Sequence, residues 1–156
     1  MPSCEAKIEP TAINVVSPTE AFDEKIALQE SLIQALGDGN RDVSRLTKIS
    51  YNYPERADIT IIWTINYHAI QSSRIVNAQI DATNILKILE EHKTRFVYVI
   101  LIGTFPIPDE SGSNFEIEVI DLGFNKSKLE KVDWEAFQPS DIYKLADVAV
   151  IEDEWK

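Results

Sequence analysis

The chain lacks a second cysteine, a long apolar run and a typical leader sequence. With Cys4 as its only cysteine it forms no intramolecular disulfide, which fits a reducing compartment. No stretch approaches the roughly 20 apolar residues that a membrane-spanning helix needs. The polar start Met-Pro-Ser-Cys-Glu-Ala-Lys has no apolar signal segment, so we expect a cytoplasmic protein. The alternative is an exported protein with a lipid anchor on Cys4, if a signal peptide has been removed.

Motifs of nucleophilic, phosphate and metal chemistry are also missing. No serine stands in a Gly-x-Ser-x-Gly turn, and the glycines of 37–40 follow a helix instead of preceding one. The acidic segment 109–120 resembles a calcium loop only superficially, because its glycine is fourth and its twelfth residue is Ile120. We therefore predict no metal and no cofactor. The alternative interpretation is a hairpin turn in which Asp109 caps backbone amides and Gly112 has a positive φ.

Basic residues are scarce and histidines scarcer. The net charge is −11, and residues 106–156 alone carry thirteen acidic and five basic side chains, a net charge of −8. This balance argues against nucleic acid or an anionic membrane as a partner and favours a protein with a basic surface. His68 follows a predicted strand, where a catalytic base is conceivable, although a surface-loop histidine is the more common case. We expect His92 to lie at a helix C-terminus, where a cation meets the helix dipole favourably.

The hydrophobic pattern predicts helices, hairpins and a single domain. Ser17-Pro18-Thr19-Glu20 is typical of a helix start, and apolar residues at helical spacing continue to Gly37. Ile59, Ile61, Trp63 and Ile65 share one face of a strand and alternate with Thr60, Ile62, Thr64 and Asn66, which indicates a sheet buried on one side. The predicted helices are 18–36, about 78–93, a short one toward Phe137 that a capping box at Ser127-Lys-Leu-Glu130 opens, and a last one through Ala149. The second helix is expected to start between Asn77 and Asp81 and to bury Ala82, Ile85, Leu86 and Leu89. The predicted strands are 46–53, 58–67, 96–106 and 115–124.

The order α-β-β-α-β-β-α-α predicts an α+β two-layer sandwich. Its sheet has four largely antiparallel strands, with both long helices on one face. Residues 1–16 are expected to form an extended arm, 17–151 the single domain and 152–156 an acidic tail. In the second hairpin strand the apolar positions change phase, which indicates a bulge near Ile120-Asp121.

Residues 58–147 carry a resemblance to a known group of proteins. Gly103-Thr-Phe-Pro106, together with the downstream Asp133-Trp134, is similar to the motifs of a family of small bacterial proteins of unknown function. The resemblance implies a bacterial protein, and many members of that family are exported or lipid-anchored. The extra residue in the 109–114 turn and the missing tryptophan after Asp147 depart from the family pattern. Because the family has no settled activity, the resemblance implies a fold and a domain identity only.

The sequence favours a non-enzymatic binding or interaction domain with a basic protein as its partner. Its acidic third suggests the binding residues, with Trp155 as an aromatic contact: Asp109, Glu110, Glu152, Asp153, Glu154 and Trp155. A disordered end is the competing interpretation for Trp155. The alternatives are an acidic inhibitor that mimics nucleic acid in a basic groove and a small enzyme that uses carboxylates near His68.

Overall fold

A computed structural model gives the fold for residues 18–39, 43–52 and 57–156. The predicted arm 1–16 and the helix-start residue Ser17 lie outside these described residues. Six elements follow one another in the predicted order: α1 (Pro18–Leu36), β1 (Leu46–Asn52), β2 (Asp58–Thr64), α2 (Gln71–Glu91), β3 (Tyr98–Pro108) and β4 (Asn114–Asn125). Five short elements then complete the described chain: α3 (Lys126–Leu129), η1 (Pro139–Asp141), α4 (Ile142–Leu145), β5 (Val148–Ile151) and η2 (Asp153–Trp155).

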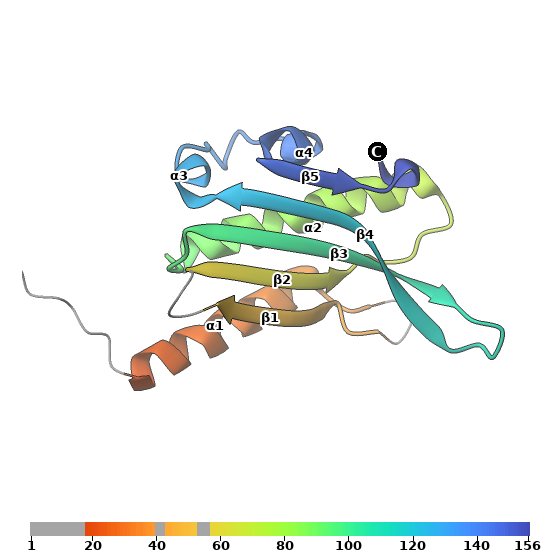
Figure 1. The fold of residues 1–156 in the computed structure, drawn as a ribbon, viewed down its shortest axis with the longest axis horizontal. Coiled ribbons are helices and arrows are strands. Elements are labelled where there is room, and N and C mark those ends of the chain that lie inside the picture. Colours follow the sequence, from red (N-terminus) through yellow and green to blue (C-terminus); the bar gives the residue numbers. More distant parts are fainter. Residues whose placement is uncertain (1–17, 40–42, 53–56) are drawn as a thin grey trace, which may run out of the picture.

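The strands form one mixed sheet in the order β1-β2-β3-β4-β5. Three neighbouring pairs are antiparallel, whereas β2 and β3 run parallel because α2 carries the chain back between them. Figure 1 shows α1 and α2 behind the sheet, with no described element in front of its middle strands. The α+β class and the placement of both long helices on one face are confirmed, while the predicted sheet is one strand short.

The missing strand is β5, which the sequence assigned to a last helix. Ile142, Leu145 and Ala149 have helical spacing, but the helix ends at Leu145 because Ala146 takes the extended conformation φ −57°, ψ 143°. The chain then pairs Val148 with Gly123 on the free edge of β4. A four-residue strand is too short for its own alternation to outweigh the helical pattern before it.

The second long helix begins earlier than predicted. We expected a start between Asn77 and Asp81, but α2 starts at Gln71, and the polar stretch 71–73 is its first turn. The N-cap position before this helix is occupied by Ile70, whose side chain cannot accept a hydrogen bond from the first turn. The sequence therefore carried no capping signal at Ile70, and the start of α2 was predicted too late. The predicted buried stripe of this helix, Ala82, Ile85, Leu86 and Leu89, is confirmed.

The first helix has the predicted length, but its buried face is only partly the predicted one. The sequence placed Ile26, Ile33 and Leu36 on one helical stripe, with Leu32 alongside it. Leu32 and Leu36 are buried together with Leu28, whereas Ile26 and Ile33 are 41% and 48% exposed. Both stripes repeat every three to four residues, so only the packing of α1 against α2 selects between them.

The hairpin between β3 and β4 agrees with its predictions. Gly103 pairs with Ile120 and the next residue, Thr104, with Glu118, which leaves Val119 as the extra residue of a bulge. In the turn the Asp109 carboxylate accepts hydrogen bonds from the backbone N–H groups of Ser111 and Ser113, at 2.8 and 2.9 Å. Gly112 has φ +82°.

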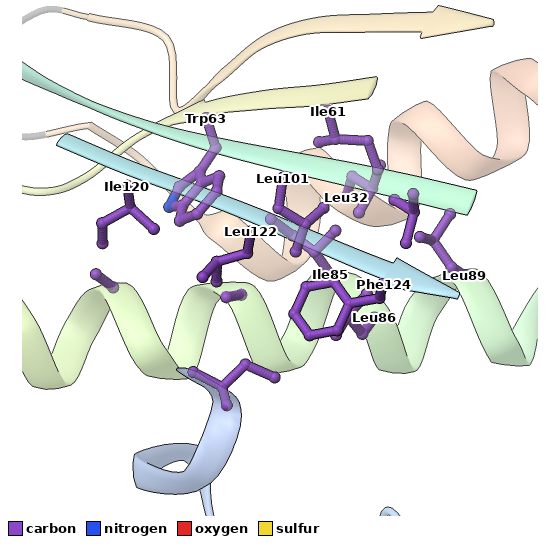
Figure 2. Close-up of a cluster of buried hydrophobic side chains, with 14 of the residues drawn as sticks. Leu32, Ile61, Trp63, Ile85, Leu86, Leu89, Leu101, Ile120, Leu122 and Phe124 are labelled. Atoms are coloured by element: carbon purple, nitrogen blue, oxygen red, sulfur yellow. The ribbon is translucent and has the colours of Figure 1, made fainter. Parts of the chain in front are cut away.

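The core lies between the sheet and the helix layer. Trp63 is fully buried, and Ile59, Ile61 and Ile65 share its side of the sheet, as predicted. Figure 2 shows the labelled side chains of this core between the strands and α2. They come from α1, α2 and the three central strands: Leu32, Ile61, Trp63, Ile85, Leu86, Leu89, Leu101, Ile120, Leu122 and Phe124.

The third helix, α3, is shorter than predicted. It covers only Lys126–Leu129, and the residue before it, Asn125, forms no side-chain cap, so the predicted capping box at Ser127 is wrong. The later residues Trp134 and Phe137 instead contact each other in an edge-to-face pair, with ring centroids 5.4 Å apart. Both rings pack against the core from an irregular segment.

Candidate functional site

The side of the sheet opposite the helices is the most distinctive surface of the described residues. In β2, β3, β4 and β5, alternate side chains point to this side of the sheet, where they are partly buried or exposed. We call this surface the open sheet face and define it by its eight main residues: Thr60, Ile62, Tyr98, Ile100, Ile102, Asp121, Val148 and Val150. Val148 and Val150 are 50% and 60% exposed, which is unusual for valines beside other aliphatic side chains.

Strand register brings these residues into contiguous rows. Thr60 pairs with Ile100, which is opposite Gly123, and Gly123 pairs with Val148. The next row runs from Ile62 through Ile102 and Asp121 to Val150. Directly opposed residues on one face lie within side-chain contact distance, so Ile62, Ile100 and Ile102 form an aliphatic patch on β2 and β3. Gly123 and Asp121 on β4 separate this patch from Val148 and Val150 on β5. Contiguous exposed apolar patches are characteristic of interaction surfaces.

One carboxylate interrupts this apolar patch. Asp121 lies between Ile102 and Val150, and its carboxylate makes no hydrogen bond or ion pair with any other described residue. Desolvation by burial raises the pKa of Asp121. The nearest cation in the same row is Lys48, opposite Ile62 and three strands away. At the usual strand spacing that is about 14 Å, beyond the screening length of about 8 Å at physiological salt.

Further negative charge surrounds the tyrosine of this face. Partial desolvation, followed by three nearby carboxylates, raises the pKa of the Tyr98 phenol. The carboxylates are, in order of effect, Asp147, Asp121 and Asp58. The part of the pKa shift that comes from these carboxylates reflects a negative potential around Tyr98, because a like charge opposes formation of the phenolate. The open sheet face therefore combines aliphatic surface with an unneutralised acidic charge.

A polar cluster closes one end of the face. The Glu116 carboxylate accepts hydrogen bonds from the hydroxyls of Thr64 and Thr104, at 2.5 and 3.0 Å, and the Thr47 hydroxyl is 3.2 Å from that of Thr64. Thr64 and Thr104 are buried. Buried hydroxyls need partners, and here one carboxylate serves both. We interpret the cluster as a structural element of the strand ends, since its polar groups satisfy one another.

The predicted binding residues of the hairpin turn lie apart from the open sheet face in sequence and role. Asp109 and Glu110 are exposed, and the Asp109 carboxylate organises the turn. The hydrogen bond from the Ser111 hydroxyl, together with the turn amides, lowers the pKa of Asp109. Its carboxylate therefore has a structural role that the sequence predicted, and its role in binding stays a prediction.

The C-terminal residues 152–156, which we predicted to form an acidic tail, bury one side chain against the rest of the fold. Trp155 is only 5% exposed, and its ring meets Phe105 edge to face with centroids 5.1 Å apart. The interpretations of Trp155 as an exposed contact or as part of a disordered end are wrong, because a ring distant in sequence buries it. Glu152, Asp153 and Glu154 remain exposed around it.

Neither histidine lines the cavity beside β1 or the cavity beside the start of α2. His68 is exposed, and its Nδ1 accepts a hydrogen bond of 3.1 Å from the backbone N–H of Ile70. The surface-loop interpretation of His68 fits this geometry. His92 caps the C-terminal end of α2, as expected, and its Nε2 lies 2.8 Å from the hydroxyl of Ser31 on α1. Cys4 lies outside the described residues.

Two absences hold for the described part of the chain. No group of three or more histidine, cysteine, aspartate or glutamate side chains is arranged to hold a metal ion there. No helix within the same residues is long and apolar enough to cross a membrane.

Sequence reasoning missed the open sheet face because it considered each strand alone. The signal was present at Asp121, a charged residue inside the apolar run Val119-Ile120-Asp121-Leu122. It was interpreted only as a sign of the bulge. The aliphatic neighbours of Asp121, Ile102 and Val150, come from two other strands, and one of those strands was predicted to be a helix.

Comparison of the chain with protein-family models, curated proteins and solved structures finds no match. The resemblance of residues 58–147 to a family of small bacterial proteins therefore stays a prediction.

Proposed function

We propose that this chain is a non-enzymatic interaction domain whose open sheet face binds a protein partner with a basic and aliphatic surface. The observation that carries the proposal is Asp121, an unpaired carboxylate within the aliphatic row of Ile102 and Val150. A partner that covers this row must neutralise the carboxylate, because a buried unpaired charge is strongly unfavourable. A lysine or arginine flanked by aliphatic side chains meets both requirements.

The charge of the whole chain supports the same partner chemistry. A net charge of −11 attracts a basic protein over distances set by the screening length and repels acidic ones. The open sheet face then supplies the contact itself, since aliphatic side chains provide the short-range part of binding. Long-range attraction and local fit therefore favour one class of partner.

A model peptide tests the surface chemistry directly. We would titrate acetyl-(Lys-Val)3-amide, and separately its glutamate counterpart, into the ¹⁵N-labelled protein at about 50 and about 300 mM salt. The expected result is saturable shifts of the amides around Ile102, Asp121 and Val150 with the lysine peptide only, and weaker affinity at high salt. Shifts that avoid these residues, or equal binding of both peptides, would contradict the proposal.

A matched pair of variants isolates the carboxylate. Asp121→Asn should weaken the lysine peptide by about ten-fold, because the partner's cation loses its counter-charge. Glu91→Gln changes the net charge equally, on an exposed position at the end of α2, and should leave the affinity nearly unchanged. Equal effects of the two variants would mean that only net charge matters, which is the behaviour expected of the alternative acidic mimic of nucleic acid.

Charge reversal of the C-terminal acidic residues addresses the predicted tail contacts. If Glu152, Asp153 and Glu154 steer a basic partner, reversing all three slows association and leaves stability nearly intact, because exposed charges contribute under about 1 kcal/mol. If the association rate changes neither with salt nor with this triple charge reversal, the three residues have no role beyond solubility.

The enzymatic alternative gains no support from the geometry around His68. Its ring is exposed, its Nδ1 is engaged by Ile70, and the described cavities are lined by other residues. A catalytic base needs a substrate position within hydrogen-bond distance and partial exclusion from water.

A further inference from the structure

A second surface feature, a cavity beside the start of α2, carries an inference of its own. The cavity has a volume of about 260 Å³ and lies between the first turn of α2, the end of β3 and the C-terminal residues. Its lining contains one cation, Arg74, and one carboxylate, that of the exposed Glu154. The other residues that the argument uses are Tyr67, Gln71, Phe105, Ile107 and Trp155. This volume is close to the lower end of the range for small-molecule sites, about 300 Å³.

Arg74 is the chemically distinctive residue of this cavity. Its guanidinium carbon lies 4.6 Å from the ring centroid of Tyr67 and 4.9 Å from that of Phe105. Its Nε donates a hydrogen bond to the carbonyl oxygen of His68. The stacking and this bond fix the plane of the guanidinium, so little conformational freedom is lost when a ligand binds it.

The terminal amino groups of this guanidinium have no acceptor in the described ranges 18–39, 43–52 and 57–156. Among the described residues Arg74 forms no ion pair, and its one hydrogen bond uses Nε. Arg45, by contrast, is buried, and it uses Nε and both terminal nitrogens as donors to protein oxygens, whereas Arg74 is only partly buried. A planar guanidinium with free terminal N–H groups matches the two oxygens of a carboxylate.

The remaining walls define the rest of the ligand. Phe105 and Trp155 are nearly buried and form an edge-to-face aromatic pair, and Ile107 adds an aliphatic side chain. Aromatic walls favour a flat apolar body, which gains contact area and stacking geometry there. The N-terminal turn of α2 has no acidic residue and no side-chain cap, so its partial positive charge also favours an anion.

We propose that this cavity binds a small carboxylic acid with a flat apolar body. The carboxylate pairs with the terminal N–H groups of Arg74, and the body lies against Phe105 and Trp155. The cavity is separate from the open sheet face and would take an anionic ligand, whereas the open sheet face is proposed to take a cationic one. The two proposals can therefore succeed or fail independently.

Benzoate and its neutral counterpart benzamide test the proposal with the unmodified full chain. At the efficiency of ordinary small ligands a nine-atom probe such as benzoate binds with a Kd of about 10 mM or tighter. NMR observes the three indole N–H groups, of which only that of Trp155 lies at the cavity, while Trp63 and Trp134 serve as internal controls. We expect benzoate to shift the Trp155 signal saturably and to bind at least ten-fold more tightly than benzamide.

Variants assign the effect to the guanidinium. Arg74→Met keeps the aliphatic stem and should weaken benzoate at least ten-fold, whereas Lys131→Met removes the same charge from an exposed position and should change the affinity less than two-fold. Arg74→Lys keeps the charge and should still lose most of the affinity, because an ammonium cannot pair two oxygens in one plane. A thermal melt of each variant confirms that it is folded.

Three results would overturn the proposal. They are the absence of a saturable shift at Trp155, equal affinity for benzoate and benzamide, and an Arg74→Met variant that binds benzoate as the unmodified chain does.

Discussion

The ring of Tyr98 on β3 covers the backbone of Gly123 on β4. A Cβ placed on Gly123 would come within 1.9 Å of the Tyr98 hydroxyl oxygen and 2.7 Å of Cζ. The two residues are diagonal neighbours, since Tyr98 pairs with Asn125 and Gly123 with Ile100. Aromatic side chains that cover a glycine on the adjacent strand compensate for its missing side chain. This contact holds Tyr98 flat on the open sheet face.

Gly123→Ala should displace the Tyr98 ring toward solvent. Because the clash is with the far end of a side chain, we expect only about 1 kcal/mol of destabilisation. The pKa of Tyr98 should fall toward its ordinary value, since partial desolvation is the main cause of its rise. An NMR pH titration of the tyrosine ring carbons measures this. An unchanged Tyr98 titration would contradict the contact.

Asp121 should make the fold less stable as the pH rises. Burial raises its folded pKa, so the folded state holds the proton more tightly than the unfolded state, and stability is lost as the pH passes from the unfolded to the folded pKa. Asp121→Asn should therefore be more stable than the unmodified chain at pH 7, with the difference vanishing below about pH 3.8. Urea unfolding across this range measures it. Asp141→Asn, at an exposed ion pair with Lys144, is the control and should show no such gain.

Arg45 should be the most sensitive polar residue of the core. Its guanidinium pairs with the Asp81 carboxylate and donates to the carbonyl oxygens of Leu36 and Thr64. Burial raises the pKa of Asp81, and the charge of Arg45 opposes that rise. Arg45→Met should cost about 3–5 kcal/mol, because it leaves a buried carboxylate without its partner.

The double variant Arg45→Met with Asp81→Leu separates the charge from the lost hydrogen bonds. It should recover part of the stability, since no uncompensated charge remains, while the two carbonyl oxygens stay unpaired. Chemical denaturation measures both variants. If Arg45→Met alone unfolds at no lower denaturant concentration than the double variant, the unpaired Asp81 carboxylate is not the cause of the lost stability.

Trp63 should be the largest single contributor to core packing. Its side chain is fully buried, and Gly103 on β3 lies so close that an added Cβ would be 3.0 Å from the Trp63 ring. Trp63→Ala should destabilise the fold by about 3–5 kcal/mol through the cavity it leaves. Gly103→Ala should cost about 1–3 kcal/mol by overpacking the same contact. A melt of either variant identical to that of the unmodified chain would show that the site relaxes freely.

Local pattern in the sequence determined the elements that carry a strong period or a specific turn residue. Pro18 and Gly37 bounded α1, the alternation around Trp63 assigned the buried face of β2, and Gly112 marked the hairpin turn. These features depend on backbone conformation and on periodicity within one segment, which the residues themselves set.

Tertiary structure decided everything that depends on a neighbour distant in sequence. It selected Leu28 over Ile26 and Ile33 for the buried stripe of α1, because only one stripe faces α2. It also buried Trp155 against Phe105, a ring fifty residues earlier in the chain.

The candidate sites belong to the same class. β5 is a strand because the edge of β4 supplies the hydrogen-bond partners that the backbone of this four-residue segment could not find within itself. The pairing of β4 with β5 also brings Val150 beside Asp121. The fold likewise brings Arg74 against the rings of Tyr67 and Phe105. The sequence determined the charge and the apolar content of these surfaces, whereas the pairing of strands and helices decided which residues meet on them.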